Sequence, residues 1–147
     1  MSKIAHFISS ICYIGYFPIA SGTFASFIAL LVWWFFVSDI NVQCISIILI
    51  IILGTYVSHL TEKQYQAKDP SFIVIDEFAG MFISLFLIPK NIYLYILAFI
   101  LFRIFDIIKP LYIDTVQKYK YGIGVMADDI LAGVLSCLIA HIVLFLM

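Results

Sequence analysis

Long apolar segments separated by short polar turns determine what this chain can fold into. Of its 147 residues, 65% are hydrophobic and only 12% are charged, whereas a soluble domain carries about 25% charged residues. A run of about 20 apolar residues is long enough to cross the hydrocarbon core of a bilayer as a helix. We therefore expect an all-α fold, a polytopic membrane helical bundle, with residues 1–147 forming a single integral-membrane domain.

The apolar runs predict about five transmembrane helices. Their expected ranges are 22–37, 42–60, 71–88, 92–108 and 126–147. Asp76 and Glu77 interrupt the third run, so this span is either short and tilted or carries its acids inside the membrane boundary.

Two further segments are expected to lie at the membrane surface. Polar residues, glycine and proline interrupt the apolar run in residues 4–20, which favours a retained interfacial or short re-entrant segment over a cleaved signal peptide. Residues 111–121 mix apolar and charged side chains, as in a helix that lies along the membrane with Lys118 and Lys120 near anionic lipid.

The basic residues predict the orientation of the chain. With five spans, one face receives all but one of the eight Lys and Arg residues: Lys3, Lys63, Lys68, Arg103, Lys109, Lys118 and Lys120. Only Lys90 falls on the other face. Because basic residues favour the cytoplasmic side, the N-terminus is predicted to be cytoplasmic.

The same topology gathers the acidic residues on the cytoplasmic face. Asp39 alone lies outside, and the others are Glu62, Asp69, Asp76, Glu77, Asp106, Asp114, Asp128 and Asp129. The topology rests on the hydrophobic pattern and the basic residues, not on the acids. Their convergence is therefore independent evidence for a functional site.

Three charged residues spaced by three share one helix face near the end of the fourth span: Arg103, Asp106 and Lys109. One interpretation is a local ion pair, with Lys109 snorkelling to the surface. The other is a phosphate site, because charge is costly within a membrane and the Arg guanidinium matches phosphate oxygens with a fork of donors.

Two acidic pairs, Asp76-Glu77 and Asp128-Asp129, are candidate metal ligands. Asp128 and Asp129 stand near the expected start of the fifth span, where one acid would suffice to cap the helix. Two adjacent carboxylates repel each other unless they share a cation. Mg²⁺ suits this role because it binds carboxylate oxygens together with water and substrate phosphate.

The sequence Ser21-Gly22-Thr23 opens the first span. Ser21 or Thr23 could simply cap the helix. Alternatively, Gly22 and Thr23 could bind a phosphate oxygen through the exposed backbone N–H groups of the helix N-terminus.

Other chemistries are excluded or disfavoured. The cysteines Cys12, Cys44 and Cys137 lack metal-type spacing, and the chain has no P-loop, GxSxG or HExxH motif. No basic cluster indicates nucleic-acid binding, and no protein partner is predicted. A small ion-coupled transporter or channel subunit remains the alternative, but it would spread its charges through the bilayer depth.

Four blocks of sequence resemble signature blocks of the phosphatidylglycerophosphatase A family. They are GTFAS at 22–26, DEFAG at 76–80, FRIFDIIKP at 102–110 and GIGVMADDILAG at 122–133. They occur in the family's order and spread over most of the chain. Phe24 stands where many members have Trp.

The resemblance implies a magnesium-dependent, multi-pass enzyme of the bacterial inner membrane. Such an enzyme is a phosphoric monoester hydrolase that converts phosphatidylglycerophosphate to phosphatidylglycerol in phospholipid biosynthesis, taking its lipid substrate from the bilayer.

The expected metal ligands, for one or two Mg²⁺ ions, are Asp76, Glu77, Asp128 and Asp129, of which Asp129 is also expected to be catalytic. The expected phosphate-binding residues are Arg103, Lys109, Gly22 and Thr23, and Arg103 and Lys109 are also expected to be catalytic. Asp106 is expected to be catalytic as a metal ligand, a general base or a nucleophile.

Overall fold

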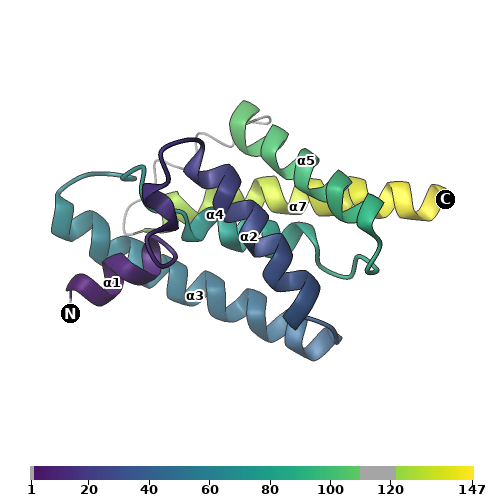
Figure 1. Ribbon diagram of the computed structural model, residues 1–147, viewed down its shortest axis with the longest axis horizontal. Helices are drawn as coiled ribbons and strands as arrows, with labels where there is room; N and C mark the ends of the chain where they lie inside the picture. Colours follow the sequence, from purple (N-terminus) through teal and green to yellow (C-terminus); the bar gives the residue numbers. More distant parts are fainter. Residues whose placement is uncertain (1, 110–121) are drawn as a thin grey trace.

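The structure is a computed structural model that describes residues 2–109 and 122–147 (Figure 1). Within these ranges every regular element is helical, which confirms the all-α prediction for this part of the chain. The elements are α1 (Ser2–Ser9), a 3-10 helix η1 (Ile14–Tyr16), α2 (Ser21–Phe36), α3 (Ile40–Tyr65), α4 (Ile75–Ser84), α5 (Ile92–Ile108) and α7 (Ile123–Leu146). The predicted surface helix at 111–121 lies outside the described residues.

Two of the described helices are long and apolar enough to cross a membrane. They are α3, with 26 residues, and α7, with 24, or about 39 and 36 Å at 1.5 Å per residue. The helices α2 and α5 have 16 and 17 residues, and α4 has only 10. The predicted count of about five spans is therefore not confirmed.

The N-terminal segment forms two short helices instead of one long one. Ile11, Cys12 and Tyr13 have φ angles of 46°, 55° and 68°, so the chain turns sharply between α1 and η1. The Val74 N–H donates to the Ser9 carbonyl at 3.0 Å, which ties this turn to the residue before α4. Residues 4–20 thus contain no helix of spanning length, as expected for an interfacial or re-entrant segment.

Helix α4 is the centre of the bundle. Nine of its 10 residues are buried, and it packs against α2, α3, α5 and α7. Figure 1 shows it enclosed between α2 and α7. The helix is shorter at both ends than the span predicted at 71–88. Residues 71–74 precede α4, and Leu87, with a φ of 57°, lies in the turn that follows it.

Glycine allows α4 and α7 to approach closely. A Cβ atom added to Gly133 would lie 2.5 Å from the Gly80 carbonyl oxygen, and one added to Gly80 would lie 2.7 Å from the Asp129 carbonyl oxygen. Small residues at such a contact let two helix backbones pack directly on each other. This contact brings the first turn of α4 beside the second turn of α7.

Two helix starts differ from the sequence prediction. The residue that precedes α2 is Ala20, with φ 50°, and neither Ser21 nor Thr23 caps this helix. Helix α7 begins at Ile123 after Gly122, whose φ of 73° favours glycine. Asp128 and Asp129 therefore lie in the second turn, and the expectation that they open the helix is wrong.

Candidate active site

Three carboxylates from two helices form a cluster in which Asp76 and Asp129 are buried and Glu77 is partly buried. Asp76 and Glu77 belong to the first turn of α4, and Asp129 to α7; one oxygen of each lies within 4.8 Å of the other two. Asp76 is 8% exposed and Asp129 3%. We call these three residues the carboxylate cluster. Like charges this close and this buried repel strongly unless a cation or a proton compensates them.

The cluster leaves acceptor atoms free. Within the described part of the chain, Glu77 Oε2 and Asp129 Oδ2 are buried and have no hydrogen-bond partner. Asp76 Oδ1 accepts a hydrogen bond from the Glu77 N–H at 3.1 Å. Buried polar atoms are normally paired, so these free oxygens are acceptors that could hold a cation or a proton.

Gly22 of α2 gives the Glu77 side chain its room. A Cβ atom at Gly22 would lie 2.0 Å from Glu77 Oε1. The predicted helix start thus lies beside the carboxylate cluster, and its glycine is required for this close approach. The Gly22 carbonyl accepts a hydrogen bond from the Ser26 hydroxyl at 2.8 Å, which orients Ser26 toward the same side.

Arg103 of α5 is fixed beside Ser26. Its Nη1 forms an ion pair with Asp106 at 2.7 Å and donates to Ser26 Oγ at 3.3 Å. Its Nε is buried and has no partner among the described residues. The structure thus contains the Arg103–Asp106 ion pair that was one of the two interpretations of this spacing, and the guanidinium keeps one donor without a partner among the described residues.

Asp128 and Asp129 have separate surroundings. Asp128 Oδ2 forms an ion pair with Lys109 Nζ at 2.5 Å, and among the described residues only Asp129 of the two joins the carboxylate cluster. Consecutive helical residues point about 100° apart, and here Asp128 faces Lys109 whereas Asp129 faces the acids of α4. The structure thus brings together three of the four predicted metal ligands.

Lys109 ends α5 and reaches back across to α7. It adopts a φ of 49° at the helix C-cap, and its N–H donates to the Phe105 carbonyl. Burial lowers the pKa of Lys109, but the hydrogen bond and the charge of Asp128 outweigh this effect and raise the pKa above its ordinary value. Lys109 therefore carries its positive charge at neutral pH.

Sequence reasoning missed two residues that support the site. Ser26 lies four residues after Gly22, a spacing that places both on one face of α2. Glu62, in α3, accepts hydrogen bonds from the Asp69 N–H at 3.1 Å and from the Gly122 N–H at 3.0 Å. It thereby fixes the residue from which α7 begins.

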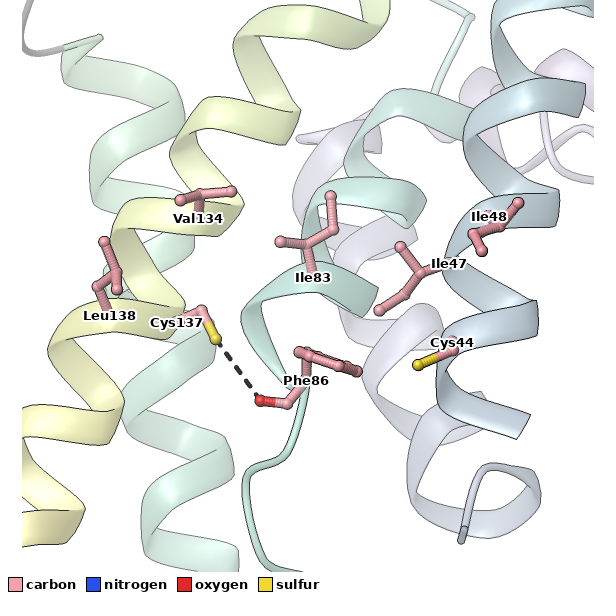
Figure 2. Close-up of a pocket in the computed structure, with 8 residues that line it drawn as sticks. All are labelled: Cys44, Ile47, Ile48, Ile83, Phe86, Val134, Cys137 and Leu138. Atoms are coloured by element: carbon pink, nitrogen blue, oxygen red, sulfur yellow. Dashed lines mark hydrogen bonds between the residues drawn. The ribbon is translucent and has the colours of Figure 1, made fainter. Parts of the chain in front are cut away.

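Two apolar grooves flank α4 and its neighbours. The first, about 370 Å³, lies between α3, α4 and α7 and includes Ile48, Ile83, Val134 and Leu138; we call it the α3–α7 groove. Figure 2 shows that its only drawn hydrogen bond runs from Cys137 to the Phe86 carbonyl. The second, about 320 Å³, includes Thr23 of α2 and Phe99 of α5; we call it the α2–α5 groove.

The predicted phosphate contact Thr23 therefore borders an apolar groove. Gly22, its neighbour, contacts the carboxylate cluster. The start of α2 thus separates a charged side from an apolar side.

Comparison with known proteins identifies the family. A family model described as phosphatidylglycerophosphatase A matches residues 7–144. The Escherichia coli (strain K12) protein named phosphatidylglycerophosphatase A is 36% identical over 133 residues, which cover 88% of this chain and 77% of that protein. A Haemophilus influenzae protein of the same name is 39% identical over 100 residues, covering 65% of this chain and 60% of that protein.

A third relative carries a different name. The Bacteroides thetaiotaomicron protein named "Putative phosphatidylinositol-3-phosphatase" is 36% identical over 130 residues, which cover 83% of this chain and 82% of that protein. No solved structure gives a significant match to the chain. The extent of the family match and the two relatives of the same name show that the chain belongs to the phosphatidylglycerophosphatase A family and is a phosphatase.

Proposed function

We propose that this chain hydrolyses the terminal phosphate monoester of phosphatidylglycerophosphate, giving phosphatidylglycerol and inorganic phosphate for phospholipid biosynthesis. The observation that carries the proposal is the carboxylate cluster beside the free Nε of Arg103, in a member of this family. Anionic ligands for a cation and a cationic donor for an anion stand together, which is what a phosphate ester bound to a metal requires.

Three carboxylates fit a divalent metal ion. Asp76, Glu77 and Asp129 offer hard oxygen ligands close together, and two of their oxygens are buried without partners in the described chain. This donor set suits Mg²⁺, which is held by carboxylates and keeps water or phosphate oxygens as its other ligands. A divalent cation held there by Asp76, Glu77 and Asp129 would supply charge stabilisation for the phosphoryl oxygens and would make a bound water more acidic.

Arg103 and Lys109 are proposed to bind the phosphate. The Arg103 guanidinium is oriented by Asp106 and Ser26 and still has Nε to offer, so it can neutralise charge that develops during phosphoryl transfer. Lys109 contributes its charge from the end of α5, where Asp128 holds it. The N–H groups around Gly22 and Thr23 are proposed to bind a further phosphate oxygen.

Asp106 is proposed as the general base. Its ion pair with Arg103 supports this role, because Asp106 would lie next to a phosphate bound by that residue. It would accept the proton of the attacking water as the new bond to phosphorus forms, and the bond from phosphorus to the leaving glycerol oxygen breaks. The leaving glycerol oxygen would take up the proton that Asp106 accepted, so that Asp106 returns to its carboxylate form and phosphatidylglycerol leaves with a hydroxyl group.

The reaction is proposed to occur at the cytoplasmic face of the bacterial inner membrane in a multi-pass protein. Along α3, Ile45, Ile48, Leu49 and Ile52 are between 56% and 64% exposed. An apolar surface of this kind is unfavourable in water and suits contact with lipid. The distribution of Lys and Arg supports a cytoplasmic N-terminus.

A phosphate-release assay on purified protein in detergent micelles tests the proposal. The substrates are phosphatidylglycerophosphate, phosphatidylinositol 3-phosphate, phosphatidic acid and a soluble phosphate ester, each with Mg²⁺ or with chelator. We expect phosphatidylglycerophosphate to react fastest, and only with Mg²⁺. Faster turnover of phosphatidylinositol 3-phosphate would refute the substrate, and undiminished activity in chelator would refute the metal.

A further inference from the structure

We infer that the α2–α5 groove is a binding site for one acyl chain of the lipid substrate, an inference that rests on the proposed function. The groove would hold the chain while the phosphate lies between Arg103 and the carboxylate cluster. It would thereby select amphiphilic phosphate esters and set the depth at which their headgroups meet the site.

The position of the groove beside the charged residues supports this occupant. Thr23 borders the groove, and the preceding residue, Gly22, contacts Glu77. On α5, Phe99 borders the groove and lies one helical turn, about 6 Å, before Arg103. On each of the two helices that line the groove, α2 and α5, the apolar surface and the charged site are therefore separated by no more than one helical turn.

A hydrogen bond joins the two walls where the groove meets the charged residues. Arg103 Nη1 donates to Ser26 Oγ at 3.3 Å, and Ser26 directly precedes Phe27, which lines the groove. The rings of Phe27 and Phe99 meet edge to face, with centroids 6.4 Å apart. The groove thus has a cationic, hydrogen-bonding border beside an aromatic wall, which complements an anionic headgroup joined to an apolar chain.

The volume suits one chain and not a whole lipid. At about 320 Å³, the groove is near the lower end of the 300–1,000 Å³ range typical of small-molecule sites. Phe17 and Phe24 stack with ring centroids 4.5 Å apart at one side of it. The second chain of the substrate would remain in the surrounding bilayer.

The α3–α7 groove is the competing location, and its position argues against it. Figure 2 shows this groove lined by side chains such as Ile83, Val134 and Leu138, with no charged residue. Ile83 lies seven residues after Asp76, about 10 Å further along α4. This groove therefore has no charged border at which the headgroup of the same lipid could be held.

The experiment compares two chain lengths of one headgroup. The kcat/KM for phosphate release is measured with dibutanoyl and dipalmitoyl phosphatidylglycerophosphate, for the unaltered protein, Phe27→Trp, Phe99→Trp and the matched control Leu138→Trp in the α3–α7 groove. The butanoyl chains are too short to fill the groove, so this substrate reports chiefly folding and headgroup chemistry.

We expect both α2–α5 groove variants to lower the ratio of long-chain to short-chain kcat/KM by about ten-fold, because misplacing a reacting group by about 1 Å can reduce a rate by up to ~100-fold. Leu138→Trp should leave the ratio unchanged. The smaller variants Phe27→Ala and Phe99→Ala should retain dipalmitoyl turnover and extend it to bulkier branched chains.

Two results would overturn the inference. One is an unchanged ratio in Phe27→Trp and Phe99→Trp, and the other is a lowered ratio in Leu138→Trp, which would move the chain to the α3–α7 groove. Failure of the proposed function gives a different result, since the unaltered protein would then release phosphate from neither chain length.

Discussion

The Lys109 ammonium and the Asp128 carboxylate form an ion pair at 2.5 Å that joins the end of α5 to the second turn of α7. The next residue, Asp129, points instead into the carboxylate cluster. One acid of the pair therefore holds a cationic side chain in place, and its neighbour completes a set of metal ligands.

Substitutions in the Lys109–Asp128 ion pair should affect stability and activity differently. Asp128→Ala should lower stability by about 1–3 kcal/mol, less than for a fully buried pair because Lys109 is partly exposed, and should also lower phosphate release. The double variant Lys109→Met/Asp128→Leu should regain most of the stability without regaining activity. Thermal unfolding in detergent and the phosphate assay measure the two effects. Recovery of activity in the double variant would show that Lys109 does not bind phosphate.

Removing one carboxylate of the cluster should have opposite effects on stability and activity. In chelator, Asp76→Asn or Asp129→Asn relieves repulsion among buried acids, so the melting temperature should rise above that of the unaltered protein. With Mg²⁺ the unaltered protein should gain up to about 2.7 kcal/mol at 100 times the Kd, and the variants should gain little and release no phosphate.

Asp39→Asn is the matched control for these carboxylate variants. Asp39 caps α3 through the N–H groups of Asn41 and Val42, and Asn caps a helix about as well as Asp. The Asp39→Asn variant should therefore gain as much stability from Mg²⁺ as the unaltered protein and should keep full phosphatase activity. An equal Mg²⁺ response in Asp129→Asn would place the metal elsewhere.

Gly22→Ala should displace Glu77. The new Cβ would lie 2.0 Å from Glu77 Oε1, so the carboxylate must move, and we expect activity to fall about 10- to 100-fold. Gly22→Ala/Glu77→Asp should recover part of this loss, because the shorter acid leaves room for the methyl group. Kinetic assays on both variants provide the measurement.

Gly54→Ala is the control for this substitution. Its Cβ would meet the flexible end of Met126 at 2.8 Å, a contact that a small side-chain shift can relieve. Activity should stay close to that of the unaltered protein. If Gly22→Ala were equally active, the close approach of α2 to Glu77 would be unimportant for catalysis.

Arg103→Lys should reduce kcat more than it raises KM. Lysine keeps the charge but lacks the planar set of donors that reaches Ser26, Asp106 and a phosphate together. Steady-state kinetics at saturating Mg²⁺ would show this, and Ser26→Ala should cause a smaller loss because it removes only one support of the guanidinium. An unchanged kcat in Arg103→Lys would assign Arg103 to the stability of the helix end.

Local spacing predicted part of the site, and long-range packing determined the rest. The interval between Arg103 and Asp106 was enough to put the two side chains on one helix face and to offer an ion pair as one interpretation, because it is a property of one helix. The contact between Gly22 and Glu77 joins residues on different helices, and no local pattern encodes it. The sequence analysis therefore did not predict this contact.

The different directions of Asp128 and Asp129 depend on where α7 begins. The sequence suggested that these acids open the helix, but Gly122 starts it six residues before Asp128. That start is held by Glu62, on α3. Similarly, an apolar run interrupted by Asp76 and Glu77 predicted a span at 71–88, whereas only Ile75–Ser84 is helical in α4, which packs among four helices.

The direct contact of Gly80 with Gly133 fixes more than the packing of two helices. Because main-chain atoms touch there, the spacing between the backbone segments that carry Asp76, Glu77 and Asp129 is set by the peptide backbone and not by adaptable side chains at the contact. A binding site held by such a rigid spacer has little freedom to widen. Preference for a small ion over a larger one, such as Mg²⁺ over Ca²⁺, would then follow from two residues that carry no side chain.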